Sequence, residues 1–200
     1  MDDIVKQAMA KWPDVPHCYG WLALDARGAW RMRDEQTQRL GQLGDKIAHV
    51  ALLAFINRNY THDEQGRWYF QNGPQRVYVD LEATPFIVHT DPAQGLVLHT
   101  REQLTDIDRI WLTSAGQLVL ASGERVAQVD DRDVGQCMVH LVIDGMPASD
   151  EQIMAWIECK TEPAALMFEY AGSRIPVHHL DSEAIASEFG FVRKPQPDPA

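Results

Sequence analysis

Residues 66–81, GRWYFQNGPQRVYVDL, predict a β-hairpin on which the rest of the fold is built. Side chains alternate between the two faces of a strand, so Trp68 and Phe70 share one face of the first predicted strand. Asn72 and Gly73 supply a turn that tolerates positive φ, and the return strand ends at Leu81. This stretch therefore predicts two antiparallel strands joined by a tight turn.

The same pattern recurs twice further along the chain. Residues 116–130, GQLVLASGERVAQVD, repeat the strand, the Gly-containing turn and the return strand. Residues 167–177, MFEYAGSRIPV, form a shorter third copy. In the second copy the alternation slips after Val126, which predicts a β-bulge. Repeated hairpins are thus the expected building unit.

Residues 45–57 predict the strongest helix, because apolar residues recur at helical spacing. Leu52, Leu53 and Ile56 leave little polar face, so we expect this helix to be deeply buried. A charge at Ala51 is then expected to unfold the domain. Hairpins with packed helices predict an α+β fold of two subdomains.

The predicted division is an N-terminal subdomain over 1–95, a hairpin-rich subdomain over 96–192 and a flexible tail over 193–200. In the second subdomain, residues 137–144, CMVHLVID, predict a strand. Ser149 and Gln152 fit a capping box that begins a helix.

Composition excludes several function classes. The net charge of -11 argues against nucleic acid as a partner, because phosphate binding needs a basic surface. It also disfavours an anionic membrane surface, and no apolar run approaches the roughly 20 residues of a membrane span. The three cysteines, Cys18, Cys137 and Cys159, are expected to be free thiols in a reducing compartment, with Cys137 buried and inert. These features predict a cytoplasmic protein.

The eight histidines raise the question of a metal site, but no metal-ligand spacing occurs among them. His89 and His99 become neighbours if their strands pair, yet two imidazoles alone make a poor site. No metal and no cofactor are therefore expected. The densest acidic cluster, Asp130, Asp131 and Asp133, lacks the pattern of a calcium loop and is interpreted as a solvated turn.

Arginines recur at equivalent hairpin positions: Arg76, Arg125 and Arg174 each precede the residue that opens a return strand. One interpretation is that each covers an aromatic side chain or pairs with a local acid. The other is that Arg76 and Arg125 join Trp68 in a ligand site. Such a site suits an anionic, partly apolar small molecule or an acidic peptide segment.

The order of features resembles uncharacterised proteobacterial domain-of-unknown-function families. The features are Gly28 and Trp30 in a hairpin, the helix at 45–57, the acid-rich turn at 62–66, and Trp68, followed by residues 77–86. The resemblance implies an α+β protein of two subdomains with repeated hairpin-plus-helix motifs, and a role in signalling or regulation.

The sequence favours a non-enzymatic module that binds a small ligand or a protein partner. Two alternatives remain open: a small hydrolase or isomerase that uses carboxylates such as Asp130 and Asp131, and a structural subunit of a complex. The oligomeric state is also left open.

Overall fold

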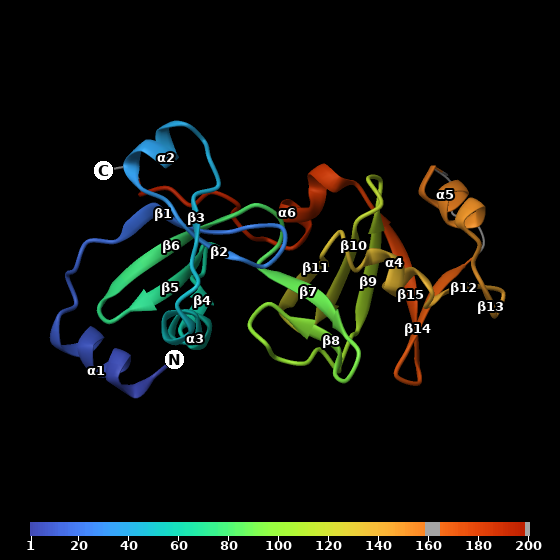
Figure 1. Ribbon diagram of the computed structural model, residues 1–200, viewed down its shortest axis with the longest axis horizontal. Coiled ribbons are helices and arrows are strands. Elements are labelled where there is room, and N and C mark those ends of the chain that lie inside the picture. Colours follow the sequence, from blue (N-terminus) through green and yellow to red (C-terminus); the bar gives the residue numbers. More distant parts are fainter. Residues whose placement is uncertain (159–164, 199–200) are drawn as a thin grey trace. The chain divides into compact units, whose positions relative to one another are not determined.

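The computed structural model describes residues 1–158 and 165–198, and it confirms an α+β fold in two subdomains (Figure 1). Unit 1 comprises Met1–Pro85 together with the described part of Phe189–Ala200, and unit 2 comprises Phe86–Glu188. Each unit contains one β-sheet. None of the helices in the described residues is long and apolar enough to cross a membrane.

Unit 1 is built on a six-stranded sheet, counted over the described residues, in the order β3-β2-β1-β6-β5-β4. Its strands are β1 (Cys18–Leu24), β2 (Trp30–Met32), β3 (Asp45–Lys46), β4 (Tyr60–His62), β5 (Trp68–Asn72) and β6 (Gln75–Leu81). Its helices are α1 (Asp3–Lys11), α2 (Glu35–Arg39) and α3 (Val50–Arg58).

The organising hairpin is β5–β6, as predicted, although its turn is shifted by one residue. Asn72 pairs with Gln75, so the turn residues are Gly73 and Pro74 rather than Asn72 and Gly73. Gly73 adopts a φ of 57°, which glycine tolerates without steric cost. The core of unit 1 includes Tyr78 and Val79 of the return strand, both fully buried.

The helix predicted over 45–57 is shorter and less buried than expected. Asp45 and Lys46 form β3 instead, which pairs with β2. Helix α3 begins after His49, whose Nδ1 accepts a hydrogen bond from the Leu52 amide. Only Ile56 of the helix is buried, and Ala51 is exposed, so the prediction of deep burial was wrong. One helix face packs against the sheet, and the apolar stripe is wider than that face.

Unit 2 is built on a nine-stranded sheet in the described residues, in the order β13-β12-β14-β15-β9-β10-β11-β7-β8. Its strands are β7 (Phe86–Asp91), β8 (Gly95–Leu98), β9 (Arg109–Thr113), β10 (Leu118–Ser122), β11 (Arg125–Val129), β12 (Leu141–Ile143), β13 (Met146–Pro147), β14 (Leu166–Tyr170) and β15 (Ser173–Leu180). Its helical segments are α4 (Val134–Met138), α5 (Asp150–Glu158), the 3₁₀ turn η1 (Ser182–Ala184) and α6 (Ile185–Glu188).

The second and third predicted hairpins are β10–β11 and β14–β15, each with a two-residue turn. The bulge predicted after Val126 does not form, because β11 pairs with β10 in one continuous register. Residues 126–129 are all buried, so apolar side chains are needed on both faces of this strand. That requirement, rather than an extra residue, explains the lost alternation.

Two further segments of unit 2 were assigned from the sequence. The strand predicted over 137–144 is limited to β12, because α4 occupies the residues before it. Cys137 is fully buried at the end of that helix, and burial raises the pKa of its thiol to about 12. The capping box is confirmed: Ser149 and Gln152 exchange side-chain-to-backbone hydrogen bonds before α5. Cys159 lies outside the described residues.

The C-terminal segment packs on unit 1 and is not a loose tail where the structure describes it. Phe191 is buried, and the Val192 amide donates to the Gly66 carbonyl. The Leu81 amide donates to the Arg193 carbonyl at 2.7 Å. The predicted division near residue 95 also differs from the observed one, which precedes β7, the strand that opens the second sheet.

A parallel pairing accompanies every one of the three hairpins. The return strands β6, β11 and β15 pair in parallel with β1, β7 and β9, respectively. Each partner strand precedes its hairpin in the chain. Each also pairs in antiparallel fashion with the strand that follows it: β1 with β2, β7 with β8, and β9 with β10. The repeat is therefore a hairpin joined in parallel to an earlier pair of strands.

The burial of α3 can be tested with two substitutions on the same helix. We expect Ile56→Ala to lower the free energy of unfolding by about 2–5 kcal/mol, because it leaves a cavity between α3 and the sheet. Ala51→Asp lies on the exposed face and should change it by less than about 0.5 kcal/mol. Urea denaturation followed by circular dichroism measures both; equal losses would contradict the observed orientation of the helix.

Candidate functional site

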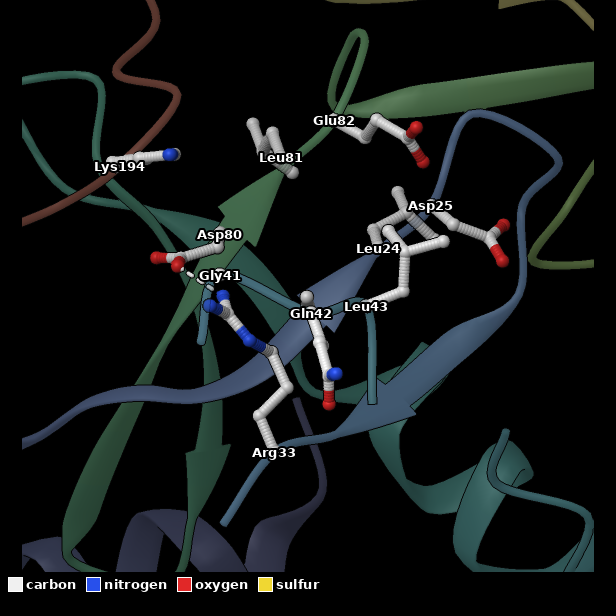
Figure 2. Close-up of a pocket in the computed structure, with 11 residues that line it drawn as sticks. Leu24, Asp25, Arg33, Gly41, Gln42, Leu43, Asp80, Leu81, Glu82 and Lys194 are labelled. Atoms are coloured by element: carbon white, nitrogen blue, oxygen red, sulfur yellow. Dashed lines mark hydrogen bonds and ion pairs between the residues drawn. The ribbon is translucent and has the colours of Figure 1, made fainter. Parts of the chain in front are cut away.

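A cavity of about 180 Å³ lies in unit 1, at the carboxyl ends of the parallel strands β1 and β6 (Figure 2). Crevices beyond the carboxyl ends of parallel strands are recurrent ligand sites in α/β proteins. The lining residues are Ala23, Leu24, Asp25, Arg33, Gly41, Gln42, Leu43, Asp80, Leu81, Glu82 and Lys194. They come from the two strand ends, the segment after β2, the loop after α2, and the C-terminal segment.

The backbone after β2 positions Arg33. Its amide donates to the Trp21 carbonyl of β1, and its carbonyl accepts a hydrogen bond from Gln38 of α2. The wall opposite is the loop that returns from α2, which ends at Gly44 with a φ of 85°. A Cβ at Gly44 would lie 2.3 Å from the Met32 carbonyl oxygen, so only glycine fits there.

Arg33 and Asp80 form a largely buried ion pair across the cavity, with side-chain exposures of 13% and 15% (Figure 2). Arg33 Nη1 donates to Asp80 Oδ2. Burial raises the pKa of Asp80, and the nearby charges of Arg33 and Lys194 oppose that shift only in part. The Nε–H of Arg33 is buried and has no hydrogen-bond acceptor within residues 1–158 and 165–198.

The two other carboxylates of the lining are already hydrogen-bonded. Asp25 Oδ1 accepts the Ala29 amide at 2.7 Å, and Asp25 Oδ2 accepts Arg31 Nε at 2.7 Å. Glu82 Oε2 accepts the Ala26 amide at 2.8 Å. These acids fasten the turn after β1, so their capacity to bind a further cation is reduced.

The cavity thus combines two cationic side chains with an apolar wall. Arg33 contributes a donor without an acceptor, and Lys194 adds a second positive charge to the lining. Leu24, Leu43 and Leu81 supply the apolar part (Figure 2). Such an arrangement can hold a small molecule that carries a negative group and a short hydrocarbon part.

The structure places the predicted ligand residues in local contacts. Trp68 is 8% exposed and packs against the Tyr60 ring with centroids 4.8 Å apart. The Arg76 guanidinium lies over the Tyr69 ring, 4.7 Å from its centroid.

Arg125 pairs with Glu102, with Nη1 and Oε2 2.8 Å apart, and Arg174 lies 3.5 Å from Glu169. These contacts fit the interpretation in which each hairpin arginine has a local neighbour. Trp68 and Arg76 belong to unit 1 and Arg125 to unit 2. A joint site at Trp68, Arg76 and Arg125 therefore stays a prediction.

The acidic cluster of unit 2 differs from the solvated turn that the sequence predicted. Asp130 is fully buried, and the Arg132 guanidinium and amide hold the pKa of its carboxyl far below the usual range. Asp131 is exposed. His89 and Asp133 lie beside Asp130 because β7 and β11 are parallel neighbours. Sequence reasoning paired His89 with His99 and missed this grouping, since hairpin repeats alone do not predict a parallel pair.

The raised pKa of Asp80 has a consequence for stability. A carboxyl whose pKa is higher in the folded state binds its proton more tightly there, so its contribution to stability grows as the pH falls. We expect the wild-type protein to gain stability relative to Asp80→Asn as the pH falls toward about 3.9, the pKa of an unfolded aspartate. Urea denaturation of both proteins at several pH values measures this difference, and a difference that shrinks on acidification would contradict it.

Comparison with known proteins identifies the family and gives no activity. No curated protein matches the chain. A DUF1285 family protein from Silicibacter pomeroyi DSS-3 is similar in structure, with a TM-score of 0.49, 13% identity, and coverage of 88% of this chain and 94% of that one. A DUF1285 family protein from Shewanella baltica OS155 gives a TM-score of 0.39 and 12% identity, covering 56% of this chain and 85% of that one.

The family DUF2944, described as "Protein of unknown function (DUF2946)", matches residues 1–196. That match spans both units, including the strands that line the cavity and the C-terminal segment that supplies Lys194. The chain therefore belongs to this family of proteins of unknown function.

Proposed function

We propose that this protein is a non-enzymatic module of the cytoplasm that binds a small anion in the unit 1 cavity and has a regulatory role. The observation that carries the proposal is the Nε–H of Arg33, a buried donor with no acceptor among the described residues. Leaving such a donor unsatisfied costs about 1–3 kcal/mol. A ligand oxygen that reaches this donor removes that cost, and because less than 1 Å² of Nε is accessible, the Arg33 side chain must turn toward the cavity on binding.

The size of the cavity restricts the ligand class. Drug-sized ligands occupy pockets of about 300–1,000 Å³, whereas this cavity measures about 180 Å³. A short-chain carboxylate fits these dimensions, with its carboxylate toward Arg33 and its methylene groups against Leu24 and Leu81. The three carboxylates of the lining repel multiply charged anions, and the small volume excludes larger ones.

Electrostatics also predict how this ligand binds. The net charge of -11 repels an anion at long range. Binding must therefore come from short charge-assisted hydrogen bonds inside the cavity, which salt screens less than long-range attraction. Asp80 competes with the ligand for Arg33, so protonation of Asp80 favours binding.

Titration with acetate, propionate and butyrate, followed by NMR chemical shifts, tests the proposal. We expect saturable shifts around Arg33 and Asp80 for at least one acid, and none for the neutral analogue propionamide. Arg33→Lys keeps a positive partner for Asp80 but lacks the planar Nε–H donor, so affinity should fall at least fivefold.

The matched control is Arg58→Lys, which changes an arginine of unit 1 that pairs with Asp2 outside the cavity. It should bind the acids as the wild-type protein does. The proposal fails if no acid gives saturable shifts around Arg33, or if both lysine variants bind equally well.

Binding at Trp68, Arg76 and Arg125 remains a separate prediction for an acidic peptide partner. The Arg125 side chain, which is 46% accessible although it pairs with Glu102, supports it. The double variant Arg76→Ala/Arg125→Ala tests it, because such a peptide should lose affinity while the short carboxylates retain theirs.

A further inference from the structure

Three metal-ligating side chains converge in unit 2, at the carboxyl end of β11 and beside the middle of its parallel neighbour β7. His89 lies on β7, and Asp130 directly follows β11, where its amide donates to the Val88 carbonyl. Asp133 directly precedes α4. One ligand atom from each of these residues lies within 4.8 Å of the other two. Residues distant in sequence are thus brought to one point by the parallel pairing.

The two His-to-carboxylate separations match those between ligands of a tetrahedral metal ion. His89 Nδ1 lies 3.3 Å from Asp130 Oδ2 and 3.3 Å from Asp133 Oδ2. The His89–Asp133 contact also qualifies as a hydrogen bond, although charge-assisted N–H···O hydrogen bonds are shorter, about 2.7–2.9 Å. Zinc bonds of about 2.0–2.1 Å place tetrahedral ligands about 3.3–3.4 Å apart. Both His-to-carboxylate edges therefore have the length that a shared zinc ion requires.

Each carboxylate is also held in place by a second residue. Asp130 Oδ1 accepts the Arg132 amide and Arg132 Nε, both at 3.0 Å. Asp133 Oδ1 lies 3.0 Å from the Thr90 hydroxyl, which Gln136 Oε1 shares at 2.7 Å, and Asp133 Oδ2 accepts the Thr90 amide at 3.3 Å. Outer hydrogen bonds of this kind orient the ligands of protein metal sites. The cluster is consequently preorganised with both Oδ2 atoms turned toward His89.

We propose that His89, Asp130 and Asp133 bind a Zn²⁺ ion in unit 2, with water completing the coordination. One imidazole nitrogen and two carboxylate oxygens form a donor set that zinc accepts. Asp130 Oδ2 also receives a hydrogen bond from Arg132, but a carboxylate oxygen has a second lone pair for the metal. His89 is 31% exposed, which gives the ion a route from solvent.

The charges around this cluster favour a cation, whereas the ligand proposed for unit 1 is an anion. Asp130 and Asp133 supply two negative charges, of which Arg132 neutralises one. The net charge of -11 attracts a divalent cation at long range. The alternative occupant of the cluster is a proton, which would make His89 a charged partner of both aspartates. Metal titration separates these two states.

Isothermal titration of the metal-free full-length protein with ZnCl₂ tests the proposal. We expect one Zn²⁺ per chain at this site, with affinity reduced at least tenfold in His89→Ala and in Asp133→Asn. Thr90→Val removes only the outer hydroxyl and should reduce affinity by about tenfold. Replacing Zn²⁺ with Co²⁺ should give the visible absorption of a tetrahedral site without a thiolate ligand.

The matched control is His178→Ala, which removes an exposed histidine of unit 2 outside the cluster. It should retain the wild-type affinity for this Zn²⁺ ion, and circular dichroism should show that each variant is folded. The proposal is overturned if the wild-type protein binds no Zn²⁺. It is also overturned if folded His89→Ala binds as tightly as the wild type, or if only His178→Ala weakens binding.

Discussion

The parallel pairing of each hairpin's return strand with an earlier strand is the constraint on which the rest of the structure depends. Antiparallel hairpins form from neighbouring residues, but a parallel pair needs a crossover that carries the chain back across the sheet. Here β6, β11 and β15 all make such pairs. The paired strands lie inside their sheets, and in β11 both faces are covered, so residues 126–129 are buried whichever face they occupy.

This constraint also positions the chemically interesting side chains. The carboxyl ends of β1 and β6 carry the acids Asp25 and Asp80 of the unit 1 cavity. In unit 2 the carboxyl end of β11 brings Asp130 beside His89, which lies in the middle of β7. Both proposed sites thus lie beside a pair of parallel strands. At the third parallel pair, β9 and β15 are followed by Ser114 and Ser182, whose hydroxyls hydrogen-bond to each other at 3.1 Å.

Local patterns predicted what local interactions determine. The three hairpins, the capping box at Ser149 and the buried Cys137 follow from residues close together in sequence. The burial of α3 does not follow from nearby residues. An apolar stripe shows which face of a helix can be buried, but it does not show how much of the sheet is available to cover that face. The cavity around Arg33 has no sequence signal either: Arg33, Asp80 and Lys194 come from three distant segments joined only by tertiary pairing.

Unit 1 is interrupted in the sequence, since it includes Met1–Pro85 and the described part of Phe189–Ala200, whereas unit 2 is continuous. Domains tend to fold as units during synthesis, from the N-terminus onward. Every residue of unit 2 is therefore synthesised before Phe191 and Arg193, which dock on unit 1. Unit 1 thus contains residues made before and after the whole of unit 2, and Lys194 adds its charge to the cavity only once the later segment has docked.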